Sequence, residues 1–155
     1  MEIRRATVED IAQINRLLYQ VAGVHHKGRP DIFRPNAKKY TDVQLQKIIA
    51  DNSRPIFVGV LGNKILAHLF GVLKMVQGQS CLADRKTLYI DDLCVDETVR
   101  GQRIGQQMYA FIKDYAKKEG CYNITLNVWT CNPGAMRFYE KMGLLPQKVY
   151  MEEIL

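Results

Sequence analysis

Residues Val99–Gln106 read Val-Arg-Gly-Gln-Arg-Ile-Gly-Gln and stand between an apolar run and an amphipathic one. The first N–H groups of a helix have no intrahelical partner, and the helix dipole makes that end attractive to anions. Gly101 and Gly105 allow a ligand to approach the main chain closely, while Arg100 and Arg103 add positive charge. The stretch therefore predicts a strand-to-helix turn that suits a pyrophosphate, although an ordinary turn with two surface arginines would have the same residues.

The segments on either side of this turn predict strand–helix–strand units. A strand is expected at Thr87–Val95 and an amphipathic helix at about Ile104–Glu119. They are followed by a strand at Asn123–Val128 and a last helix at Asn132–Gly143, whose Asn-Pro start and Gly end are typical helix boundaries. Parallel pairing is expected across such units.

The N-terminal half predicts two helices and a β-hairpin. Thr7 opens a helix that Gly23 breaks, and Thr41 opens a second, shorter helix. The polar connection at 23–40 is long, and connections of that length in a compact domain are often functional. The remaining expected elements are strands at 2–6, 56–60 and 64–73, and one more strand or a bent pair at 144–154. Together these elements predict an α/β fold with a mixed β-sheet covered by helices.

Length and composition narrow the class of protein. The 155 residues fit one domain, 1–155, and the net charge of +6 is scattered instead of gathered in a basic tail. This scatter disfavours a nucleic-acid-binding module, the rival that a positive charge suggests. No apolar run is long enough to span a bilayer and no secretory leader is visible, so we expect a cytoplasmic location. The cysteines and histidines lack zinc-site spacing, so we expect no metal.

Three motifs make the sequence resemble the GNAT acetyltransferase superfamily. Arg100 and Gly105 fit its cofactor motif [QR]-x-x-G-x-[GA], with Arg103 in place of the usual middle glycine. Tyr89–Val95 resembles the family's strand before that loop, and Asn132–Gly143 resembles its closing N-x-x-A-x-x-F-Y-x-x-x-G helix. The resemblance implies a single-domain fold with a mixed, splayed sheet and about four flanking helices.

The resemblance also implies where acetyl-CoA, the acetyl donor, would bind. It would lie where the strands at 87–95 and 123–128 splay apart, with pantetheine paired to the backbone of the first strand. A bulge near Asp92 would turn a backbone N–H toward the thioester oxygen. The implied cofactor contacts are Leu93, Cys94, Val95, Arg100, Gly101, Gln102, Arg103, Ile104, Gly105, Gln106, Asn132, Ala135 and Tyr139.

Candidate catalytic residues lie on both sides of the expected cofactor. Asp91 and Asp92 interrupt an apolar strand, and an unpaired buried carboxylate is costly, so they flank an open cleft or meet partners. Either could be the general base that deprotonates an attacking ammonium, with structural and substrate-charge roles as alternatives. By resemblance to polyamine-type members, Asp91 occupies the position of their acidic residue. The resemblance implies that Tyr139 protonates the departing thiolate; the alternative is a core aromatic residue beside Phe138.

The long connection supplies candidates for the acceptor site. His25, His26, Arg29 and Asp31 lie in it and are expected to help bind the substrate, unless they are ordinary exposed loop residues.

The predicted activity is transfer of an acetyl group from acetyl-CoA to a primary amine by direct attack. The adjacent acids favour a small cationic amine as the acceptor. The alternatives are a protein lysine or N-terminal acetyltransferase and a non-catalytic acyl-CoA-binding sensor. Asn127 replaces the glutamate that ribosomal-protein N-terminal acetyltransferases tend to carry, which argues against that branch. A homodimer is implied by the resemblance alone, and no membrane partner is expected.

Overall fold

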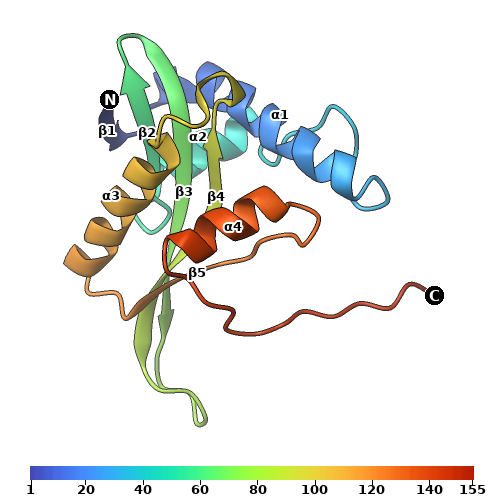
Figure 1. Cartoon of the computed structure of the whole chain (residues 1–155). Coiled ribbons are helices and arrows are strands. Elements are labelled where there is room, and N and C mark those ends of the chain that lie inside the picture. The colour runs from blue at the N-terminus through green and yellow to red at the C-terminus, as the bar shows by residue number, and fades with distance from the viewer.

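A computed structural model describes residues 1–155 and contains one five-stranded sheet with strand order β1-β2-β3-β4-β5 (Figure 1). The elements in chain order are β1 (Glu2–Arg5), the 3-10 turn η1 (Val8–Asp10), α1 (Ile11–Gly28), α2 (Asp42–Ala50), β2 (Ile56–Leu61), β3 (Lys64–Val76), β4 (Arg85–Val95), the 3-10 turn η2 (Glu97–Val99), α3 (Ile104–Lys118), β5 (Asn123–Leu126) and α4 (Pro133–Lys141). Strands β1 to β4 pair antiparallel, and β4 pairs parallel with β5. The predicted mixed α/β fold is confirmed.

Helices cover both faces of the sheet. Apolar residues of α1 and α2, including the fully buried Ile14, Leu17 and Leu45, pack on one face. The buried stripe of α3, with Met108 and Ile112 fully buried, packs on the other face, where α4 joins it (Figure 1). Burial of these stripes drives the assembly of helices that would be marginal alone.

The sheet opens between its last two strands. β4 and β5 are paired only from Thr87 with Asn123 to Ile90 with Leu126. β4 continues to Val95, but β5 ends at Leu126, so residues 91–95 have a strand neighbour on the β3 side alone. The predicted splay between these strands is therefore present.

The expected end of the first helix is wrong. α1 does not break at Gly23 but continues to Gly28, so His25 and His26 lie on the helix and not in a loop. A glycine inside a helix costs only about 1 kcal/mol, which the packing of the rest of α1 outweighs. The connection to α2 is correspondingly shorter than residues 23–40.

The strand or bent pair expected at 144–154 is absent. Residues 144–155 form no strand, and in Figure 1 they run away from the body of the molecule. A strand needs a neighbouring edge for its N–H and C=O groups, and this segment pairs with none. Its apolar side chains, among them Val149, Tyr150 and Ile154, are exposed.

No helix combines the length and apolar character that crossing a bilayer requires.

Candidate active site

The turn before α3 presents unpaired backbone donors. Gly101 and Arg103 both have positive φ values, 84° and 61°, which fold the chain tightly before the helix. The first helical hydrogen bond of this turn runs from the Gln107 N–H to the Arg103 carbonyl at 3.1 Å. The N–H groups of residues 104–106 precede it and have no acceptor within the chain. The exposed Arg100 and Arg103 lie beside them, so the turn has the free donors and the cations that an anion-binding turn requires.

Gly105 has a packing role in this turn. A Cβ atom at this position would lie 3.3 Å from a ring carbon of Phe138 and 3.6 Å from a methyl of Val95. The missing side chain therefore lets α4 and β4 approach the start of α3. Packing against Phe138 and Val95 is therefore one reason for a glycine at position 105.

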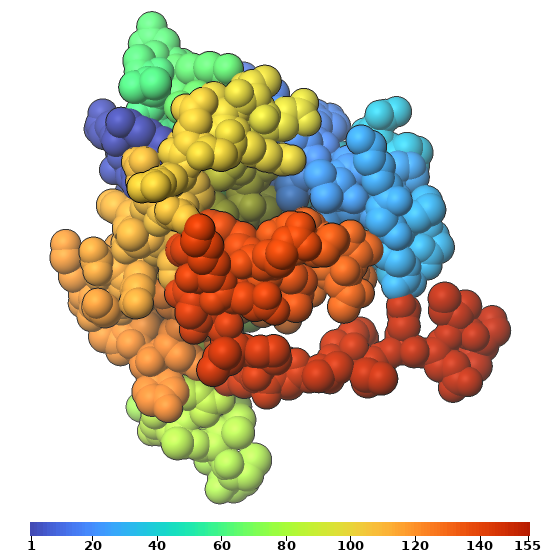
Figure 2. Space-filling view, viewed as in Figure 1, coloured from blue at the N-terminus to red at the C-terminus, as the bar shows by residue number.

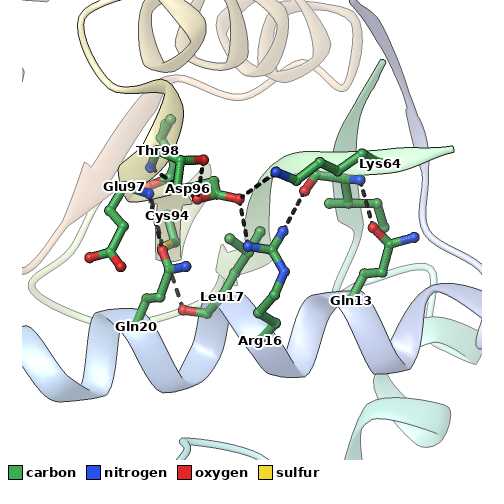
Figure 3. Close-up of polar contacts among 11 residues, drawn as sticks. Gln13, Arg16, Leu17, Gln20, Lys64, Cys94, Asp96, Glu97 and Thr98 are labelled. Carbon is green, nitrogen blue, oxygen red and sulfur yellow. Dashed lines mark hydrogen bonds and ion pairs between the residues drawn. The ribbon is translucent and has the colours of Figure 1, made fainter. Parts of the chain in front are cut away.

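A buried carboxylate, Asp96, anchors this turn to α1 (Figure 3). Its carboxylate accepts from Arg16 Nη1 at 2.5 Å, and from the N–H and hydroxyl of Thr98 at 3.1 and 2.9 Å. The Asp96 N–H donates to the Leu66 carbonyl at 2.8 Å. Burial alone would raise the pKa of Asp96, but the hydrogen bonds from Thr98 and Arg16 outweigh it and hold the pKa well below its usual range.

A β-bulge lies at the two acids of β4. Phe70 of β3 pairs with Asp92, and the next residue, Gly71, pairs with Ile90, so Asp91 has no partner across the ladder. A bulge lets two successive residues point to the same side of a sheet. Both carboxylates consequently meet groups on the side covered by α1 and α2, and the bulge predicted near Asp92 is present.

Both carboxylate oxygens of Asp91 are engaged. Lys39 Nζ lies 2.7 Å from Oδ1, and the Tyr40 hydroxyl donates to Oδ2 at 2.5 Å. Burial raises the pKa of Tyr40, and the hydrogen bond to Asp91 raises it further, so the phenol stays protonated and keeps donating. Asp91 thus ties the segment before α2 to the bulge.

Asp92 has one engaged oxygen and one that no protein group holds. Oδ2 lies 3.2 Å from Nε2 of His68, a residue of β3 that is fully buried. Oδ1 has no hydrogen-bond partner, although the carboxylate side chain is only 10% exposed. Asp92 can therefore still accept a hydrogen bond through Oδ1.

Tyr139 lies on α4, and the charge of Asp92 acts on its phenol. Its pKa is raised above the ordinary value, first by burial and second by the charge of Asp92. The phenol therefore stays protonated at neutral pH. Asn132 caps α4, as predicted, by accepting from the Ala135 N–H at 3.2 Å.

The cofactor residues expected on β4 line the open edge of that strand. Leu93 and Val95 pair with Leu69 and Ala67 of β3, which leaves their other backbone side without a strand. The Cys94 side chain instead points into the core, where its thiol lies 3.5 Å from the Leu17 carbonyl. Any contact from Cys94 to a ligand would thus come from its backbone.

The four predicted substrate residues do not form one cluster. His25 lies near Asp92 and packs its ring against Phe33, with ring centroids 5.0 Å apart. Burial lowers the pKa of His25, and the charge of Asp92 only partly offsets this. His26 instead meets the Phe33 carbonyl through Nδ1 at 2.6 Å.

Arg29 and Asp31 form an ion pair with each other, the Nη2–Oδ2 distance being 2.7 Å. Arg29 also contacts Glu152 of the C-terminal segment. These charges are largely neutralised within the chain, so this pair does not present a free cation or anion to a ligand.

His25, Phe33 and Trp129 form an aromatic cluster. Trp129, after β5, packs its ring at 5.0 Å and near right angles to Phe33.

In Figure 2 the yellow turn before α3 and the orange-red α4 border a recess with atoms of β4 at its floor. The elements that carry Asp92, Tyr139 and the anion-binding turn thus meet on one face.

Sequence reasoning missed His68, Tyr40 and Asp96. His68 stands alone in the apolar run Ile65–Phe70, and a lone polar residue in a buried strand is a signal that it has a partner. Asp96 directly follows an apolar strand in the same way. No local signal joins Tyr40 to Asp91, because they are 51 residues apart.

Comparison with known proteins identifies the family. The sequence model of the Acetyltransferase (GNAT) family matches residues 20–144. The chain belongs to this GNAT family. A crystal structure of a tetramutant of the BH1408 protein from Bacillus halodurans resembles this GNAT chain over its whole length, with 38% identity, a TM-score of 0.96 and complete coverage of both chains.

Curated relatives match a shorter stretch of this GNAT chain. A glucosamine 6-phosphate N-acetyltransferase from Arabidopsis thaliana is 32% identical over 68 residues, which is 44% of either chain. The acetyltransferase Atu2258 from Agrobacterium fabrum is 39% identical over 59 residues, 38% of this chain and 42% of the relative. The matched stretches thus span less than half the length of these relatives.

Proposed function

We propose that this chain transfers the acetyl group of acetyl-CoA to a primary amine by direct attack of the neutral amine on the thioester. The observation that supports this most is the bulge in β4, where Asp92 keeps one carboxylate oxygen without a protein donor. The phenol of Tyr139, whose pKa is raised by burial and by the charge of Asp92, stays protonated. A proton acceptor and a proton donor beside an open strand edge are what amine acetylation needs.

The turn before α3 and the outer edge of β4 fit the acetyl donor. The free N–H groups of residues 104–106, with Arg100 and Arg103, would hold the pyrophosphate. The unpaired backbone of Leu93 and Val95 would pair with pantetheine as an added strand.

The two acids would have different roles. Asp91 already accepts from Lys39 and Tyr40 through both oxygens, so it has little capacity left for a proton from the substrate. Asp92 would therefore take the proton of the ammonium. As the N–C bond forms and the C–S bond breaks, Tyr139 would pass its proton to the departing sulfur.

The acceptor we propose is a small cationic amine. The negative charge of Asp92 attracts an ammonium, and the aromatic cluster of His25, Phe33 and Trp129 offers ring faces for its apolar part. Some relatives are named for glucosamine 6-phosphate, an amine that also carries a phosphate. Arg29, four residues from His25 and from Phe33, is paired with Asp31 and Glu152 and is not free to bind that phosphate.

Turnover of acetyl-CoA should be measured with polyamines, aminoglycosides, glucosamine 6-phosphate and a lysine peptide. The same assay should then be run across pH with the variants Asp92→Asn and Asp91→Asn. We expect Asp92→Asn to lower kcat/KM about 10²- to 10⁴-fold. The loss should be largest at low pH, where few amines are neutral, and smaller at high pH. Asp91→Asn should cause a smaller loss that is equal at every pH. A wild-type pH profile for Asp92→Asn, with normal folding, would refute the role of Asp92. Donor binding without turnover of any amine would instead support a sensor.

A further inference from the structure

We infer that His68 is a positioning residue, which holds Asp92 so that one carboxylate oxygen faces the acceptor amine. This inference rests on the proposed function of Asp92 as the base. His68 lies beneath the bulge in the centre of the sheet, on β3, and its side chain is fully buried.

The contact fixes the tautomer of the imidazole. An ionised carboxylate can only accept, so Nε2, 3.2 Å from Asp92 Oδ2, must carry a hydrogen. Nδ1 is buried without any hydrogen-bond partner. A neutral ring leaves an unused lone pair there, whereas a cationic ring would bury an unpaired N–H, which is costlier. His68 is thus a neutral donor that serves Asp92 alone.

Packing holds the His68 ring in this orientation. The rings of His68 and Phe70 meet edge to face, with centroids 5.0 Å apart and an angle of 81°. Phe70 is also the ladder partner of Asp92, and Tyr40, the donor to Asp91, stacks on Phe70 at 5.6 Å. Phe70 therefore contacts both rings: that of His68, which donates to Asp92, and that of Tyr40, which donates to Asp91.

The contact with His68 matters because it holds one carboxylate oxygen of Asp92 and leaves the other without a partner. With Oδ2 held by His68, rotation of the carboxylate is restricted and Oδ1 stays directed away from the donor. A base held in one orientation loses less free energy on reaching the transition state than a mobile one. The charge of Asp92 acts on titratable groups from α1, from the segment before α2, from β4 and from α4, which are His25, Tyr40, Cys94 and Tyr139. Asp91 is its neighbour in the bulge.

The matched test compares His68→Gln with His68→Asn. The glutamine amide can place a donor near the position of Nε2, whereas the asparagine amide is too short to reach Asp92. We expect His68→Asn to lower kcat about 10- to 100-fold with little change in KM for acetyl-CoA, and His68→Gln to stay within about threefold of wild type. The acidic limb of the pH–rate profile should move to higher pH in His68→Asn, because a donor to the ionised carboxylate is lost.

Val58→Ala is the packing control. Val58 is the ladder partner of His68 on β2 and is fully buried, so its truncation opens space beside the ring without touching Asp92. It should lower stability and leave kcat and the pH profile of the folded enzyme unchanged.

A double-mutant cycle separates this inference from the proposed function. In an Asp92→Asn background, His68→Asn should cause no further loss of kcat. If Asp92→Asn is impaired while His68→Asn has wild-type kcat and pH profile, the role of His68 is overturned and that of Asp92 stands. If Asp92→Asn is fully active, both are overturned.

A measurement on the unaltered protein covers the case in which the His68 variants do not fold. Nitrogen NMR of labelled histidine should show the Nε2–H tautomer for His68, with a signal that moves in Asp92→Asn. An Nδ1–H tautomer, or a signal that does not respond to Asp92→Asn, would overturn the inference.

Discussion

Arg103 has a left-handed backbone conformation, with φ 61° and ψ 15°, at the residue before α3. The GNAT motif usually has glycine there, and glycine adopts positive φ without a steric cost. An L-residue pays about 1 kcal/mol for the same conformation. The side chain of Arg103 thus adds a cation to the anion-binding turn at the expense of backbone strain.

Replacing Arg103 separates these two effects. Arg103→Gly should raise the free energy of unfolding by about 0.5–1 kcal/mol, because the strain is relieved. Arg103→Ala removes the same charge but keeps the strain, so its stability should not rise. Both variants should bind CoA more weakly than wild type by calorimetry. Equal stability of the glycine and alanine variants would show that the left-handed conformation is not strained.

At the scale of elements, the turn that would hold the donor depends on a contact with α1. Asp96 directly follows β4, is fully buried, and joins Arg16 of α1 to Thr98 of η2. The turn is therefore positioned by a helix residue, Arg16, that precedes Asp96 by 80 residues in the chain. Loss of this carboxylate would leave the Arg16 charge and the Thr98 N–H without their acceptor.

Asp96→Asn should lower the free energy of unfolding by about 2–4 kcal/mol at pH 7 and raise KM for acetyl-CoA. The folded pKa of Asp96 lies below its unfolded value of about 3.9, so its contribution is present above that pH and fades as pH falls further. The stability gap between wild type and variant, measured by urea unfolding, should consequently be constant near neutral pH and narrow as the pH falls below about 4. Thr98→Ala, which removes only the hydroxyl bond, should have a smaller effect. A gap that stays constant down to low pH would contradict the role of the ionised carboxylate.

At the scale of the whole molecule, the C-terminal segment stands apart from the packed layers. In Figure 2 residues after α4 lie along the outside, and Leu145, Tyr150 and Leu155 are almost fully exposed. Leu144 differs, because it packs against the cluster beneath α3 and α4 and its N–H donates to the Tyr139 carbonyl at 3.1 Å. The apolar contacts of the segment thus end near residue 144, and Glu152 adds only an exposed ion pair with Arg29.

Truncation should reveal this boundary. Removal of residues 149–155 should leave Tm within about 2 °C of the full chain, because little buried surface is lost. Removal from residue 144 onward should lower Tm by about 4 °C or more, since it strips a residue from the apolar cluster. Calorimetry of the two truncated chains would measure both. A large Tm loss in the shorter truncation would mean that the segment packs in solution.

The local pattern of the sequence was enough for most of the architecture. The order of strands and helices up to α4, the helix caps at Thr41 and Asn132, and the tight turn before α3 depend on neighbouring residues, and all were predicted. These features follow from periodicity, capping and glycine placement, which act over a few residues. The bulge at Asp91 and Asp92 was expected from the family resemblance and from two acids interrupting an apolar run.

Only the tertiary structure distinguished the two acids. Their partners, Tyr40 and His68, lie 51 and 24 residues away and come from different elements, so no local pattern could assign them. The failures at Gly23 and at 144–154 have the same origin. A helix continues through a glycine when the rest of it is packed, and a strand forms only where another strand offers an unpaired edge. Local chemistry determined which elements could form, whereas long-range packing decided where they end and which carboxylate oxygen remains free.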